Sequence, residues 1–78
     1  MVSIDHCNWS ALASPRQRAE LLSACEQVSR CAWLSEAGEK LVMLLEPAWH
    51  VDLAEQCIRI YARDIDGRPT RNPVICLV

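Results

Sequence analysis

Glycine is scarce in this sequence of 78 residues, which contains only Gly38 and Gly67. Loops that cradle phosphate groups need several glycines in close succession, because their backbone amides must approach the phosphate oxygens. The sequence therefore excludes the common glycine-rich nucleotide-binding loops. Long apolar runs are also missing, since none approaches the ~18 residues that a membrane-spanning helix requires. Residues 1–6 contain neither a basic start nor an apolar stretch, and we expect no secretory signal there.

Basic residues are outnumbered, because 8 Lys and Arg stand against 10 Asp and Glu, for a net charge of -2. A surface that holds phosphate backbones by counterion release is usually far more basic. Weak nucleic-acid binding is thus kept as an alternative function, and it would use the arginines of the C-terminal part, Arg59, Arg63, Arg68 and Arg71. The small net charge and the 51% of hydrophobic residues predict a folded chain, with residues 1–78 forming a single small globular domain.

The cysteines follow no motif of paired spacing. There are five, at positions 7, 25, 31, 57 and 76, and no two of them form a Cys-x-x-Cys sequence. Disulfide frameworks favour even numbers and a secretory context. We therefore expect a cytoplasmic protein without intramolecular disulfides, whose thiols behave mostly as small buried hydrophobic groups. Cys25 in particular is expected to be buried.

A thiol or metal protein is the second functional alternative, and it would use His6, Cys7, His50 and Cys57. A zinc site needs four converging donors, which usually occur in short paired spacings. The adjacent pair at 6 and 7 and the distant pair at 50 and 57 match no such pattern. We expect no metal and no cofactor.

Arrangements for catalysis are missing as well. Cys7 beside His6 is the nearest approach to a nucleophile with a base, but side chains of adjacent residues point apart. Asp64 and Asp66 are paired carboxylates, yet arginines flank them, which favours a salt-bridged hairpin tip over acid–base chemistry. We therefore expect that the chain is not an enzyme.

The first predicted element is a helix over 15–34. Ser14 precedes Pro15, and Gln17 follows at the third helical position, which is the arrangement of a capping box with proline at the first turn. The apolar residues Leu21 and Cys25 begin a stripe that continues to 32 at helical spacing. The Ser14 hydroxyl should accept a hydrogen bond from the amide of residue 16 or 17.

Three later segments read as strands, at 40–46, 57–65 and 74–78. The first is a short apolar run between charged residues and a proline. The second alternates β-branched and charged residues and precedes the turn dipeptide Asp66–Gly67. A helix over 53–63 is the alternative for this segment, because 52–55 also resembles a capping box. The preferred fold is α+β, with the N-terminal helix packed on an antiparallel sheet of about three strands.

The leading functional hypothesis is a non-catalytic protein-binding module that serves as a small regulator, adaptor or inhibitor of a larger cytosolic protein. Tryptophan, tyrosine and arginine dominate binding hot spots. Trp33 flanks the apolar helix stripe and is expected in the core, whereas Trp49 is expected to be exposed at a strand exit. The residues expected to contact a partner are Trp49, Arg59, Tyr61, Arg63, Ile75 and Leu77.

Self-association is the last expectation. The segment 74–78 is apolar throughout, and as an edge strand it would be a template for pairing with another chain. Ile75 and Leu77 would lie on one of its faces. We therefore expect a homodimer in the absence of a partner, with 74–78 at or near the interface.

Overall fold

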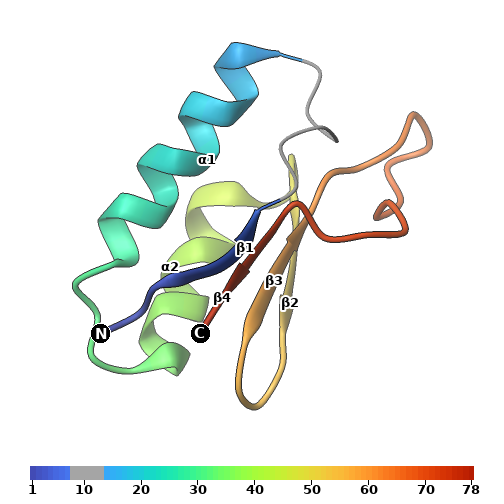
Figure 1. The fold of residues 1–78 in the computed structure, drawn as a ribbon. Coiled ribbons are helices and arrows are strands. Elements are labelled where there is room, and N and C mark those ends of the chain that lie inside the picture. Colours follow the sequence, from blue (N-terminus) through green and yellow to red (C-terminus); the bar gives the residue numbers. More distant parts are fainter. Residues whose placement is uncertain (8–13) are drawn as a thin grey trace.

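The computed structural model describes residues 1–7 and 14–78 (Figure 1). In chain order its elements are β1 (Ile4–Cys7), α1 (Pro15–Val28), α2 (Leu34–Leu45), β2 (His50–Leu53), β3 (Ile58–Tyr61) and β4 (Ile75–Leu77). Neither described helix is long and apolar enough to span a membrane.

The strands form one antiparallel sheet in the order β1-β4-β3-β2, and the two helices pack on the same face of it (Figure 1). This is the α+β fold that the sequence predicts, with four strands instead of about three and a second helix. Alternate residues of β3 and β4 are buried under the helices, whereas Arg59, Tyr61 and Cys76 lie half-buried on the other face, here called the open face.

The core lies between the helices and the sheet. Its largest fully buried side chains come from α1, α2, β3, β4 and the residue before β4, and they are Leu21, Val28, Leu41, Leu45, Ile58, Ile60, Val74, Ile75 and Leu77. Cys25 belongs to the same core and is 4% exposed, which confirms its predicted burial.

The start of α1 is confirmed and its end is not. The amide of Gln17 donates to Ser14 Oγ at 3.2 Å, and Pro15 begins the helix. The helix ends at Val28, not at residue 34, because the Ser29 hydroxyl donates to the carbonyl of Glu26 at 2.8 Å and competes with the helical pattern. The chain then turns so that Cys31 enters the core.

The predicted strand at 40–46 is wrong, because residues 40–45 belong to α2 and Glu46 is its C-cap. Ala37, Leu41 and Leu45 are buried at helical spacing, and Met43 and Leu44 between them are exposed. Gly38 lies inside the helix and does not end it. A Cβ atom built there would come within 2.7 Å of Leu53 Cδ2, so glycine lets α2 approach β2 closely.

The helical alternative for 53–63 is also wrong, because β2 and β3 form a hairpin in which Val51 is paired with Ile60. The predicted turn at Asp66–Gly67 is present, and Gly67 adopts a φ of 80°. Its tip is held by backbone contacts and not by the expected salt bridge, since Asp64 Oδ1 accepts from the amides of Asp66 and Arg68, both at 2.9 Å.

The C-terminal strand is interior, which corrects the prediction of an edge strand. β4 pairs with β1 on one side and with β3 on the other. Its backbone groups are therefore used within the sheet, and 74–78 offers no free edge for a homodimer. The edges of the sheet are β1 and β2, two strands that the sequence analysis did not predict.

Candidate functional site

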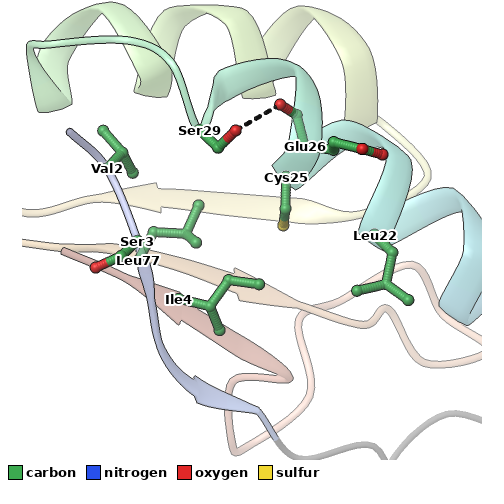
Figure 2. A pocket seen from close by; sticks show the side chains of 8 residues that line it. All are labelled: Val2, Ser3, Ile4, Leu22, Cys25, Glu26, Ser29 and Leu77. Carbon is green, nitrogen blue, oxygen red and sulfur yellow. Dashed lines mark hydrogen bonds between the residues drawn. The ribbon is translucent and has the colours of Figure 1, made fainter.

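A groove runs between β1 and α1 at one edge of the sheet (Figure 2). Its volume is about 460 Å³. The lining is mainly apolar and consists of Val2, Ser3, Ile4 and Leu77 from the sheet side and of Leu22, Cys25, Glu26 and Ser29 from the helix. This groove, called the β1–α1 groove below, has an exposed rim and a buried floor.

The residues on the two walls of the groove follow from the side-chain periods of a strand and of a helix. Ile4 is paired with the buried Leu77 and lies on the helix side of β1, and Val2 lies on the same side because side chains alternate along a strand. On α1, Leu22 and Glu26 are four residues apart, so they follow one another along one face. Val2 is 5% exposed on the floor, whereas Ile4 and Leu22 at the rim are 42% and 47% exposed.

The outer edge of β1 carries backbone groups that the sheet does not use. The amide of Ser3 donates to the carbonyl of Val78 at 2.9 Å, and the amide of Val78 donates to the carbonyl of Ser3 at 3.0 Å. Because antiparallel ladders use alternate residues, the amides and carbonyls of Val2 and Ile4 point away from β4. The residues that line the groove thus also present the free hydrogen-bonding edge.

The opposite edge of the sheet is more closed. There Gly38 brings α2 close to β2, and Leu53 lies between the two elements. The remaining hollow is smaller, about 320 Å³, and two carboxylates, those of Glu39 and Glu55, line it. The β1–α1 groove is therefore the larger and less charged of the two sites beside an edge strand.

Arg59 and Tyr61 share the open face of the sheet, at neighbouring outward positions of β3. Arg59 Nη1 lies 3.6 Å from Asp52 Oδ2, and the ring of Tyr61 lies 5.7 Å from that of His50. Both side chains therefore have contacts within the sheet and remain partly accessible. They lie on the face opposite to the β1–α1 groove.

Trp49 and Arg63 form part of the support for the loop between α2 and β2. Trp49 is 3% exposed and donates from Nε1 to Glu20 Oε1 at 3.3 Å, so its predicted exposure is wrong. Arg63 donates from Nη2 to Glu46 Oε1 at 3.2 Å and from Nη1 to the carbonyl of Gly67 at 2.8 Å. These contacts assign both residues to the internal structure.

Trp33, by contrast, was expected in the core and is 71% exposed at the N-cap of α2. The helix that would have turned its side chain inward ends five residues earlier, at Val28. Ile75 and Leu77 are 0% and 1% exposed, respectively, and therefore pack beneath the helices. Leu77 nevertheless lines the floor of the β1–α1 groove, whereas Ile75 does not, and contact of these two residues with a partner stays a prediction.

The four residues of the metal alternative do not converge. The backbone of His6 and Cys7 lies in β1, and His50 lies in β2 at the other edge, three strand spacings or about 14 Å away. Cys57 precedes β3 at the turn of the β2–β3 hairpin, whereas His50 is at the far end of that hairpin. Among the described residues, no group of three His, Cys, Asp or Glu side chains is placed to hold a metal ion.

The arginines of the nucleic-acid alternative differ in their surroundings. Arg59 is paired with Asp52, and Arg63 is held by Glu46 and Gly67. Arg68 and Arg71 are exposed in the segment between β3 and β4. Two of the four guanidinium groups thus have carboxylate partners already.

No family model, no curated protein and no solved structure matches this chain. The site is therefore interpreted from its own geometry.

Proposed function

We propose that this chain is a non-catalytic protein-binding module of the cytoplasm, which acts as a small regulator, adaptor or inhibitor of a larger protein. The observation that carries the proposal is the β1–α1 groove beside the free edge of β1. An extended segment of the partner would pair with the backbone of Val2 and Ile4 and place alternate side chains in the groove. Recognition of this kind combines main-chain hydrogen bonds with pockets for every second side chain.

The apolar surface that stays exposed in the groove supports the same site. Ile4 and Leu22 are large apolar residues that remain more than two-fifths exposed on facing walls of the groove. Covering apolar surface contributes roughly 25 cal/mol per Å², so an apolar side chain between them would gain from both walls. A cytoplasmic location agrees with the thiols, because the four cysteines whose side chains are described form no disulfide.

The homodimer stays a prediction, without the interface at 74–78. A second copy that adds to β1 is the form of self-association that this sheet leaves open, because β4 is enclosed by its neighbours. It would compete with a partner segment for the same edge.

Comparative capture from lysate of the host cell tests the proposal. The baits are the unaltered chain, Leu22→Lys in the groove and Leu53→Lys at the opposite edge. Leu53 is a matched control, because it is 53% exposed beside an edge strand, compared with 47% for Leu22. We expect a protein that the unaltered chain and Leu53→Lys retain and that Leu22→Lys loses. Equal retention by all three folded baits would contradict the proposal.

A further inference from the structure

Among the residues that the structure describes, Glu26 is the only charged one that lines the β1–α1 groove. Figure 2 shows it at the α1 rim, between Ser29 at one end and Leu22 at the other. Its backbone carbonyl accepts from the Ser29 hydroxyl, and its carboxylate takes part in none of the ion pairs found among the described residues. A partner segment in the groove therefore meets a single negative charge beside an apolar floor.

The spacing along the groove relates this charge to the apolar rim. α1 and β1 run in opposite directions (Figure 1). The four residues from Leu22 to Glu26 advance about 6 Å along the helix, and two residues of an extended chain advance about 6.8 Å. A segment that runs antiparallel to β1 and has an apolar side chain beside Leu22 thus brings the side chain two residues later level with Glu26.

We infer that the partner of the β1–α1 groove is a basic extended segment with the order apolar–x–Lys/Arg, added antiparallel to β1. This inference rests on the proposed function and specifies the chemistry of the partner. The apolar side chain lies between Ile4 and Leu22, and the cationic side chain pairs with the carboxylate of Glu26. The antiparallel direction matches the rest of the sheet and its more stable hydrogen-bond geometry.

Three blocked heptapeptides test the inference by titration of the isotope-labelled chain, followed by amide chemical shifts. The first is acetyl-Thr-Thr-Leu-Thr-Lys-Thr-Thr-amide, the second exchanges its leucine and lysine, and the third has glutamate in place of lysine. We expect shifts at Val2, Ile4 and Leu22, with the first peptide bound about twofold to fivefold more tightly than either of the others, as one exposed ion pair allows.

A charge reversal provides the control. Glu26→Lys should reverse the preference, so that the peptide with glutamate binds more tightly than the one with lysine. Glu39→Lys, which changes the same charge beside the opposite edge, should leave the original preference unchanged. Equal binding of the lysine and glutamate peptides to the unaltered chain would overturn the inference and leave the groove itself intact.

Failure of the proposed function gives a different result. If no peptide shifts the signals of Val2, Ile4 and Leu22, both the groove as a binding site and the inference are overturned. If those signals move with the concentration of the protein alone, a second copy occupies the edge, and the basic segment is rejected as its occupant.

Discussion

Ser14 and Gly38 are single residues that the surrounding structure requires for different reasons. Ser14 lies in extended conformation before α1 and accepts the amide of Gln17, a group that has no partner inside the helix. Gly38 lies where any side chain meets Leu53. One residue satisfies a hydrogen bond and the other provides space, so substitutions at the two positions should behave differently.

Ser14→Ala should lower the free energy of unfolding by about 0.5–2 kcal/mol, because the amide of Gln17 loses its acceptor. Chemical denaturation measures the change. Ser23→Ala is a matched control in the exposed middle of α1, where alanine is the better helix former, and we expect no loss there. An unfolding free energy that is the same for Ser14→Ala and the unaltered chain would show that the cap is not formed.

The loss of stability caused by a substitution of Gly38 should increase steeply with the size of the new side chain. Alanine gains about 1 kcal/mol of helix propensity, which offsets the rotation of the exposed Leu53 side chain, so Gly38→Ala should be close to neutral. Gly38→Leu forces α2 away from β2 and should cost about 1–3 kcal/mol or more. Two equally small effects in thermal denaturation would mean that the helix and the strand are not in close contact.

At the scale of elements, Glu46 connects α2 with the sheet. Its Oε1 accepts from the amide of Val51 and from Arg63 Nη2, each at 3.2 Å, and lies 3.5 Å from His50 Nδ1. The end of the helix, the start of β2 and the end of β3 are thus held by one carboxylate. The buried Trp49 closes the same loop from the core side.

Glu46→Ala should therefore lower the free energy of unfolding by about 1–3 kcal/mol, since two hydrogen bonds to a charged acceptor are lost. Glu36→Ala is the control, because Glu36 pairs with Lys40 at 3.7 Å on the exposed surface of α2, where such pairs contribute little. Urea denaturation of both variants measures the two changes in the free energy of unfolding. Comparable small losses would contradict the connecting role of Glu46.

The elements differ in how well their local sequence predicts them. The cap at Ser14, the strand around Ile58 and the turn at Gly67 depend on local chemistry and were predicted correctly. The strand at 40–46 was wrong because a short apolar run suits either structure, and the deciding period, Ala37–Leu41–Leu45, began before the run. β1 and β2 have four residues each and gain their stability from pairing with distant strands, which no local pattern shows.

The site depends on the same long-range pairing. Alternation along the predicted strand 57–65 puts Arg59 and Tyr61 on one face, and in the structure both lie on the open face of β3. The β1–α1 groove was missed, because it needs the pairing of Ile4 with Leu77, which lie at opposite ends of the chain. Trp49 was misjudged because its indole finds an acceptor, Glu20, that is 29 residues away in sequence.

At the scale of the whole molecule, the two edges of the sheet are unequal. α2 lies close against β2, whereas α1 leaves the β1–α1 groove open beside the free backbone of Val2 and Ile4. The enclosed strands β4 and β3 carry the core, so groove residues at the rim can be changed without loss of the fold. We propose this groove as the place where a partner protein binds.

Site-specific photo-crosslinking in the host cell tests that claim most directly. A photoreactive residue replaces Leu22 in the groove or, as the control, Leu53 at the opposite edge, two positions of similar exposure. We expect a crosslinked partner from position 22 that is absent, or much weaker, from position 53. Crosslinking of that partner from position 53 alone, or equally from both positions, would contradict it.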